Sequence, residues 1–272
     1  MNRAQLINQI KQKGSFLCVG LDTDKNKIPP HLAAKNNPVL EFNKAIIDAT
    51  KDYCVSYKIN TAFYEAIGAK GWQTMEETLE YIPTTHFTIA DAKRGDIGNT
   101  SDMYAQAFFK QLSFHSVTLA PYMGKDSIEP FFQYPEKWGI VLALTSNAGS
   151  TDYEQLSVGE SKLYERVIKH TTTFTNDANV MFVVGATKAE ELLNIRSLIP
   201  NHFLLVPGIG AQGGNLQEVA KYGINADCGL LINASRSIIY AGNGLDFAAK
   251  AAKEAQIIAA EMKTLLAEYG II

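Results

Sequence analysis

The sequence has few of the features that mark secreted, membrane or nucleic-acid-binding proteins. It holds only three cysteines, Cys18, Cys54 and Cys228, each in a separate apolar run, which favours buried reduced thiols over a disulfide framework or a metal site. The apolar run at 16–21 is too short for a secretory core or a membrane span. A net charge of −3 argues against a broad nucleic-acid-binding face, although a local cationic pocket can still bind a small anion. We therefore expect a cytoplasmic protein with no membrane or nucleic-acid partner.

A glycine-rich turn after the first expected strand is also missing. An open doubly wound sheet would carry its dinucleotide fingerprint there, but this strand ends Gly20-Leu21-Asp22. The glycine-rich loop of this chain is Pro207-Gly208-Ile209-Gly210-Ala211-Gln212-Gly213-Gly214, after the seventh expected strand. Barrels of alternating strands and helices commonly bind phosphate with the loops after strands seven and eight, so the position of this loop favours a barrel.

The chain does contain eight short apolar runs rich in β-branched residues. Segments with helical periodicity lie between most of them, including one that starts at Asn37-Pro38 and others at 100–112, 161–174 and 245–268. Alternating strands and helices indicate a parallel sheet, and eight units indicate closure. No linker or repeat divides the chain, so we expect one (β/α)8 TIM-barrel domain over residues 1–272. The expected strands are 15–22, 53–60, 86–91, 116–121, 139–145, 180–185, 203–206 and 227–233.

Polar side chains end four of these apolar strands, and a barrel builds its active site at the carboxyl ends of its strands. Strand side chains alternate between faces. Lys58 and Asn60 therefore share a face, as do Asp91 and Lys93 if the strand stays extended. A lysine inside an apolar strand is costly to bury without a carboxylate nearby, and we expect Asp22 and Asp91, on the neighbouring strands, to supply one. The strand-end residues are Asp22, Lys58, Asn60, Asp91, Lys93 and Asn233.

Any one of these charges alone would be equally consistent with a structural ion pair at the end of a barrel. Their convergence on one rim, beside a glycine-rich loop, favours catalysis, because enzymes concentrate mutually perturbing charges where chemistry needs them. Arg236 follows the eighth strand, where a guanidinium can bind an anion. We therefore expect an active site with a phosphate-binding end.

The run Asp91-Ala92-Lys93-Arg94-Gly95-Asp96-Ile97-Gly98-Asn99-Thr100 resembles the signature of orotidine 5′-phosphate decarboxylases, in particular the longer branch of the family. The resemblance continues in order along the chain. A bare D-x-K-x-x-D occurs in related phosphate-binding barrels, so the extended signature and its companions carry the resemblance. The companions are Val19-Gly20-Leu21-Asp22, Tyr57-Lys58-Ile59-Asn60, Leu144-Thr145-Ser146-Asn147, the loop 207–214 and Asn233-Ala234-Ser235-Arg236.

The resemblance implies a homodimeric barrel that converts orotidine 5′-monophosphate to uridine 5′-monophosphate (UMP) and CO₂ without metal or organic cofactor, in the last step of de novo UMP synthesis. It assigns the charged catalytic array to Lys58, Asp91, Lys93 and Asp96. The resemblance also implies that Asp96 and Thr100 reach the active site of the neighbouring subunit. Asp22 and Asn60 would hold the ribose and Ser146 the pyrimidine. Gln212 and Arg236, with backbone N–H groups near Gly210, Ala234 and Ser235, would bind the phosphate, and Pro207 would also contact the substrate.

Decarboxylation at C6 of the pyrimidine leaves an electron pair in the ring plane, where the carbonyl groups cannot delocalise it. Without a cofactor as electron sink, the protein must place a fixed cation beside C6. Lys93 is the candidate for that cation and for the proton that replaces CO₂. Asp91, beside the substrate carboxylate, would repel it until CO₂ leaves.

Three other functions remain open from the sequence. A magnesium-dependent lyase like hexulose-phosphate synthase uses a similar D-x-K-x-x-D, although Arg94-Gly95 and Asn60 favour the decarboxylase. A non-catalytic nucleotide-binding barrel would be expected to have lost part of the charged array, which is complete here. A half of a bifunctional enzyme would need an orotate phosphoribosyltransferase, which here would be a separate partner chain.

Overall fold

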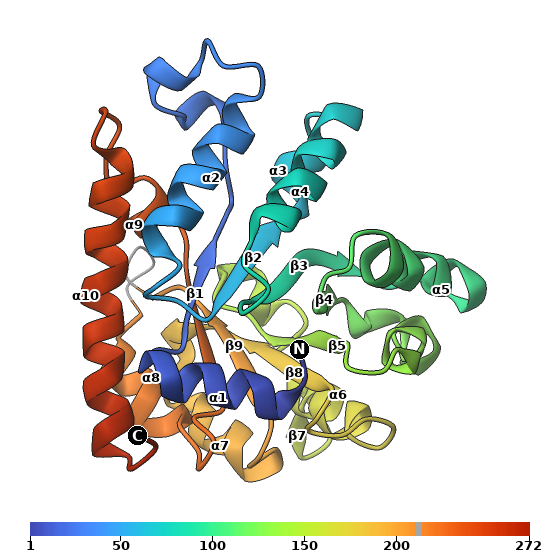
Figure 1. The fold of residues 1–272 in the computed structure, drawn as a ribbon. Coiled ribbons are helices and arrows are strands. Elements are labelled where there is room, and N and C mark those ends of the chain that lie inside the picture. Colours follow the sequence, from blue (N-terminus) through green and yellow to red (C-terminus); the bar gives the residue numbers. More distant parts are fainter. Residues whose placement is uncertain (210–213) are drawn as a thin grey trace.

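The computed structural model describes residues 1–209 and 214–272, apart from the side chain of residue 188. Eight parallel strands close into a barrel in the order β1-β10-β9-β8-β5-β4-β3-β2 (Figure 1). The (β/α)8 fold class expected from the sequence is confirmed, and each expected strand coincides with one barrel strand. The barrel strands are β1 Leu17–Gly20, β2 Ser56–Asn60, β3 Phe87–Arg94, β4 Ser116–Leu119, β5 Trp138–Leu144, β8 Val180–Val184, β9 Phe203–Pro207 and β10 Leu230–Ala234.

Helices surround the barrel, and they begin and end close to where periodicity places them. Two boundaries differ from the sequence prediction. The segment 100–112 is an α-helix followed by a π-helical turn, η3 (Ala107–Gln111), and the segment 161–174 starts as a strand of a small hairpin, β6 Ser157–Val158 with β7 Ser161–Lys162. The α-helices are α1 Arg3–Lys13, α2 Pro38–Thr50, α3 Thr61–Glu65, α4 Ala69–Tyr81, α5 Gly98–Gln106, α6 Leu163–Thr171, α7 Glu191–Leu198, α8 Leu216–Gly223, α9 Arg236–Ile239 and α10 Phe247–Glu268.

Short 3₁₀ turns fill several of the connections. They are η1 Lys25–Lys27, η2 Pro30–Leu32, η4 Pro121–Met123, η5 Lys125–Ser127, η6 Glu129–Gln133, η7 Ala148–Thr151 and η8 Ala186–Lys188. Most of them follow the carboxyl ends of strands, where the chain must turn before a helix can start. The carboxyl end of the barrel is therefore built from tight loops that hold strand-end residues in place.

Helix α1 closes the amino end of the barrel and crosses in front of it in Figure 1. Its buried Leu6 and Ile10 face the core. The Arg3 guanidinium donates to the backbone carbonyl groups of Asp177 and Asn201, just before β8 and β9. At the other end of the helix, Lys13 Nζ donates to the carbonyl of Cys54, before β2. Because this end is occupied by a helix, the open end of the barrel is the one where the strands terminate.

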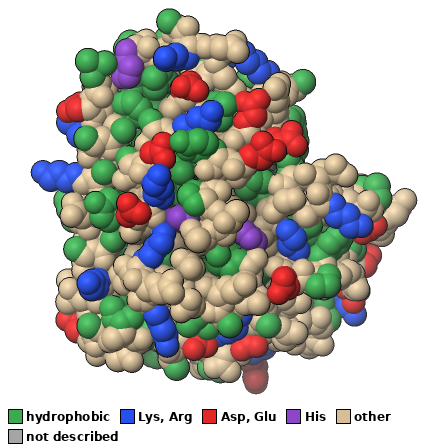
Figure 2. Space-filling model, in the orientation of Figure 1, with side chains coloured by type: hydrophobic (Ala, Val, Ile, Leu, Met, Phe, Trp, Pro, Cys, Tyr) green, Lys and Arg blue, Asp and Glu red, His purple; other side chains and the backbone are tan. Residues whose placement is uncertain are grey.

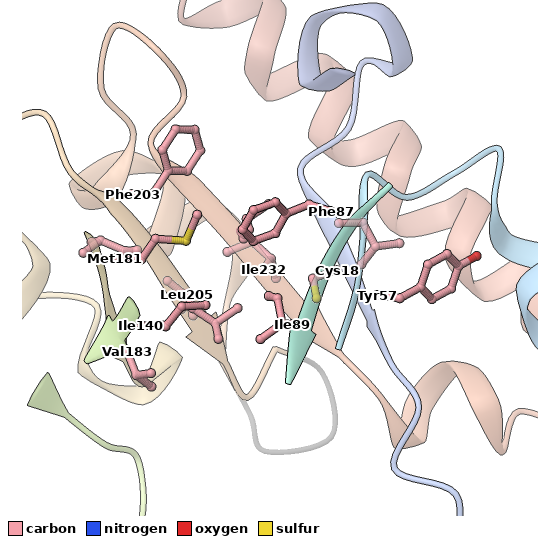
Figure 3. Close-up of a cluster of buried hydrophobic side chains, with 14 of the residues drawn as sticks. Cys18, Tyr57, Phe87, Ile89, Ile140, Met181, Val183, Phe203, Leu205 and Ile232 are labelled. Carbon is pink, nitrogen blue, oxygen red and sulfur yellow. The ribbon is translucent and has the colours of Figure 1, made fainter. Parts of the chain in front are cut away.

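Apolar side chains fill the barrel interior. Figure 3 shows side chains from β3, β8 and β9 coming together, with Phe87 and Ile89 as the contribution of β3. Because side chains alternate along a strand, the next residue on the inward face of β3 is Asp91. The same alternation on β2 turns Lys58 inward. The apolar core therefore stops just below a layer of charged side chains at the carboxyl end.

The surface and the cysteines agree with the composition. Figure 2 shows acidic and basic side chains interspersed over the face that carries α1. Cys18, Cys54 and Cys228 are free and buried, as expected. Within residues 1–209 and 214–272, no helix is long and apolar enough to cross a membrane.

Candidate active site

A cavity of about 300 Å³ opens at the carboxyl ends of the barrel strands. Within residues 1–209 and 214–272, six of the eight strands contribute a polar side chain to it, directly or through the loop that follows. Nine of the residues predicted from the sequence line this cavity, so residues far apart in the chain meet in one site. They are Asp22, Lys58, Asn60, Asp91, Lys93, Ser146, Pro207, Ser235 and Arg236.

Lys58 is held between two carboxylates. Its side chain is only 5% exposed, and its Nζ lies 3.1 Å from Asp22 Oδ1 and 3.0 Å from Asp91 Oδ2. Burial by itself lowers the pKa of Lys58, but Asp91 and Asp22 outweigh it and raise the pKa overall. The prediction that Asp22 and Asp91 supply a carboxylate to the buried Lys58 is confirmed, and Lys58 stays charged at neutral pH.

Asp91 lies between two cations. Besides Lys58, it accepts a hydrogen bond from Lys93 Nζ at 2.5 Å. Burial would raise the pKa of the Asp91 carboxyl, but the Lys58 and Lys93 ammonium groups lower it well below its usual range. The side chains of Asp22, Lys58, Asp91 and Lys93 therefore form a row of alternating charge, and Lys93, 48% exposed, is the member most open to a ligand.

The backbone at Lys93 departs from the extended conformation assumed in the sequence analysis. Its φ is +48°, and the register between β3 and β4 shifts between Ala90 and Arg94. The Lys93 N–H donates to Thr118 Oγ1 at 2.9 Å, and the Thr118 hydroxyl donates to Asp91 Oδ1 at 3.1 Å. Asp91 and Lys93 do meet in the pocket, but through a bulge stabilised by Thr118 and not through strand alternation.

The loops after β9 and β10 form the opposite end of the cavity. Gly208 lines it with a φ of +102°, a conformation that glycine adopts without strain. Ser235 Oγ donates to the Gly20 carbonyl at 3.0 Å, which ties the loop after β10 to the end of β1, and Arg236 follows at the start of α9. Ala234 is buried and is not among the lining residues. The predicted contacts of Gly210 and Gln212 lie outside the described residues.

Comparison with known proteins agrees with this geometry. Residues 15–252 match the model of the orotidine 5′-phosphate decarboxylase / HUMPS family. The chain belongs to this family. A protein of Flavobacterium johnsoniae named orotidine 5′-phosphate decarboxylase is 57% identical over 98% of both chains. The structure of Leishmania donovani OMP decarboxylase superposes with a TM-score of 0.81 and 39% identity, covering 95% of this chain and 99% of that one. The structure of UMP synthase from the same organism superposes with a TM-score of 0.81 and 41% identity. That match covers 93% of this chain and 56% of the longer UMP synthase chain.

In this family member, Asp96 and Thr100 lie away from the cavity of their own chain. Neither is among its lining residues. The Asp96 carboxylate accepts a hydrogen bond from the Ile97 N–H, just before α5, and Thr100 is exposed on that helix. The contact of both residues with a second subunit therefore stays a prediction.

The sequence analysis missed several residues that line the cavity. Thr118 gives no signal of its own in the sequence, because it lies inside an apolar strand. Asn233 was noted as a strand-end residue without a role; its Oδ1 is buried and has no hydrogen-bond partner within the described part of the chain. The loops after β5 and β10 could have indicated others by their position alone. The further lining residues are Thr118, Leu142, Thr145, Asn147, Val183, Leu205, Gly208, Ile209, Asn233 and Ser237.

Proposed function

We propose that this chain decarboxylates orotidine 5′-monophosphate to UMP and CO₂, as the last step of de novo UMP synthesis. The observation that carries the proposal is the row of alternating charges Asp22, Lys58, Asp91 and Lys93 in one cavity. The high identity to proteins named orotidine 5′-phosphate decarboxylase supports it. Fixed charges that need no reorganisation during the reaction are what a decarboxylation without an electron sink requires.

Lys93 is the group that meets the reacting carbon. The carbanion left at C6 lies in the ring plane, and an ammonium group beside it stabilises the developing charge and then donates the proton that replaces CO₂. Asp91 holds the Lys93 ammonium by a direct hydrogen bond. Lys58, clamped between Asp22 and Asp91, helps to keep the Asp91 carboxyl ionised by lowering its pKa. Lys93 becomes a neutral amine when its proton moves to C6, and it takes up a proton from solvent before the next turnover; Lys58 and Asp91 transfer no proton, so their charges stay in place.

The rest of the nucleotide fits the remaining cavity wall. Asp22 and Asn60, at the ends of β1 and β2, suit the ribose hydroxyls, and Ser146 after β5 suits the pyrimidine. Arg236 and the Gly208 loop suit the phosphate, because a guanidinium and closely approaching backbone N–H groups bind such an anion well. Binding energy at the phosphate is then available to hold the reacting end.

The activity is tested by following the loss of orotidine 5′-monophosphate absorbance with purified protein. We expect full turnover in EDTA, because the proposed chemistry uses side-chain charges; dependence on Mg²⁺ would instead indicate lyase chemistry of the hexulose-phosphate synthase kind. Lys93→Ala should lower turnover by at least about three orders of magnitude, the scale of removing a main electrostatic group. Near-normal turnover in a folded Lys93→Ala protein would rule out the assignment.

We propose further that the active unit is a homodimer with shared sites. Apolar side chains are exposed on the segment that carries Asp96 and Thr100 and on the loop after the neighbouring strand β4: Ile97 is 58% exposed, Met103 on α5 55%, and Tyr122 on η4 83%. Burial of such a patch stabilises a protein interface. In a twofold dimer, Asp96 from one chain would complete the charged row of the other.

The substrate would come from an orotate phosphoribosyltransferase on a separate chain, a partner that co-purification would test.

Shared sites make a specific prediction for mixed dimers. Lys93→Ala and Asp96→Ala homodimers should each be nearly inactive. After denaturation and co-refolding at equal amounts, each mixed dimer should contain one intact site, so about a quarter of wild-type activity should return. Recovery would require an Asp96 from one chain to serve the Lys93 of the other. No recovery, with dimers demonstrated by light scattering, would place Asp96 outside the partner's site.

A further inference from the structure

A turn after β5 forms part of the cavity wall. Thr145, Ser146 and Asn147 all line the cavity. The backbone N–H of Thr145 donates to Glu154 Oε2 at 2.7 Å, and the Thr145 hydroxyl lies 2.9 and 3.0 Å from the two Glu154 carboxylate oxygens. The same hydroxyl lies 2.6 Å from Asn147 Oδ1. One carboxylate that is outside the cavity therefore holds the first residue of a turn that is inside it.

The chain reaches Glu154 by a long excursion that folds back on itself. From the turn it passes through η7, and after Glu154 it forms the β6–β7 hairpin before α6 begins. The excursion is closed behind Glu154 by two backbone hydrogen bonds, from the Tyr164 N–H to the Glu154 carbonyl and from the Leu163 N–H to the Leu156 carbonyl, both 2.9 Å. The Glu154 backbone is therefore fixed to the start of α6, and its side chain in turn fixes Thr145 in the turn.

The turn is also confined on its other side, by the end of β8. A Cβ atom at Gly185 would lie 2.7 Å from both the Cβ and the backbone nitrogen of Ser146, closer than real contacts allow. Only glycine at position 185 admits the turn as it stands. Glu154 and Gly185 are independent constraints on neighbouring residues of the turn: Glu154 holds Thr145 by hydrogen bonds, and the end of β8 bounds Ser146 sterically.

Glu154 also borders a second cavity. A second, mainly apolar cavity of about 370 Å³ is lined by Glu154, Tyr122, Tyr153 and Leu142, and Leu142 also lines the active-site cavity. The Glu154 side chain therefore has open space beside it, and its hydrogen bonds with Thr145 hold it against the turn. The hydrogen bonds from Thr145 to Glu154 thus fix the residue that directly precedes Ser146.

We propose that Glu154 is a positioning residue that sets the base-binding wall of the cavity through Thr145 and Ser146, so that it determines selectivity for the pyrimidine while leaving phosphate binding unaffected. The inference rests on the proposed function for the identity of the ligand. The turn follows β5, which β8 and β9 separate from β10, the strand before Arg236. The part of a nucleotide near this turn is therefore a different part from the one that Arg236 would bind.

Titration calorimetry with UMP and with ribose 5-phosphate separates the two ends. Glu154→Ala should weaken UMP binding by about tenfold or more, the scale of losing hydrogen bonds to a charged group, and should leave ribose 5-phosphate affinity at the wild-type value. Glu154→Gln, which keeps an acceptor for the Thr145 N–H, should recover much of the loss. Glu160→Ala is the matched control, because Glu160 is an exposed carboxylate in the hairpin of the same excursion.

A double-mutant cycle shows whether Glu154 acts through Ser146. The losses of UMP affinity in Ser146→Ala and Glu154→Ala should be less than additive when combined, and Gly185→Ala should reproduce the selective loss by steric means. Equal loss of both ligands in Glu154→Ala, or unchanged UMP affinity in a folded variant, would overturn the inference. If the wild-type protein bound ribose 5-phosphate but showed no preference for UMP, the proposed function itself would fail instead.

Discussion

Thr118 links the backbone and the charge of the active site. One hydroxyl accepts the Lys93 N–H and donates to Asp91 Oδ1. A lysine at φ +48° is uncommon for a non-glycine residue and requires surrounding contacts to maintain it. Thr118 supplies such a contact from the neighbouring strand, and it also orients the carboxylate that holds the Lys93 ammonium. The position of Lys93 therefore depends on an uncharged side chain on β4.

Thr118→Val keeps the side-chain shape and removes this hydroxyl. It leaves the Lys93 N–H and one hydrogen bond to Asp91 unmade, so we expect turnover to fall by roughly tenfold to a hundredfold. UMP affinity should stay near the wild-type value, because the ribose and phosphate contacts are made elsewhere. Thr118→Ser, which restores the hydroxyl, should restore most of the turnover. Steady-state kinetics and calorimetry would measure the two effects, and equal losses in turnover and affinity would contradict a role limited to Lys93 and Asp91.

At the scale of elements, helix α2 shows how a local signal gains a tertiary function. Asn37 caps the helix, with its side chain accepting from the Leu40 N–H at 3.4 Å, and Pro38 occupies the first turn. The sequence predicted this start. The Asn37 amide also donates to Thr74 Oγ1 on α4 at 3.0 Å, so the cap fastens two helices of the outer ring to each other.

Asn37→Ala should therefore destabilise the fold by about 1 to 2 kcal/mol, the scale of losing an N-cap. Turnover at 25 °C should not change, because Asn37 is not among the residues lining the cavity. Chemical denaturation measures the loss. Asn36→Ala is the matched control, since Asn36 precedes it and its side chain makes no hydrogen bond within the described residues; an equal loss in both variants would mean that capping is not the cause.

At the scale of the whole molecule, one buried and two partly buried histidines make stability depend on pH. Burial, with Lys13 next in effect, lowers the pKa of His86 to about 4. Burial likewise lowers the pKa of His115 to about 3 and of His202 to about 4. Lys13 Nζ lies 2.8 Å from His86 Nε2. These rings are neutral in the folded protein at pH values where an unfolded imidazole, with a pKa near 6.5, is protonated.

The unfolded chain thus binds more protons than the folded one between pH 6.5 and about 4. The contribution of these histidines to stability is complete above pH 6.5 and is lost as pH falls toward 4. Denaturant midpoints measured across this range should decline with a slope corresponding to uptake of about three protons on unfolding. His86→Gln should reduce that slope by about one proton. A stability that stayed constant from pH 6.5 to 4.5 would show that these rings are accessible in the folded state.

Short-range sequence patterns determined the barrel and most of its charged row. Apolar runs at regular intervals fix where the strands lie. Alternation along β2 and β3 places Lys58 and Asp91 on the inward faces of their strands, an orientation that depends on the pattern of each strand alone. The need of a buried ammonium for carboxylates then selects Asp22 and Asp91 as its partners. These inferences hold because each depends on the residues of one strand and on the cost of burying charge.

Only the tertiary structure decided the position of Lys93 in that row and the position of the cavity wall at Ser146. The bulge at Lys93 depends on a hydroxyl from β4, 25 residues away in the chain. The turn at Ser146 depends on Glu154, which returns to it after a long excursion, and on the absence of a side chain at Gly185. Such contacts join residues whose separation in sequence carries no periodic signal, because the distances between them are set by the closure of the barrel. The charges at the strand ends were thus readable from the sequence, and their exact geometry was a property of the closed barrel.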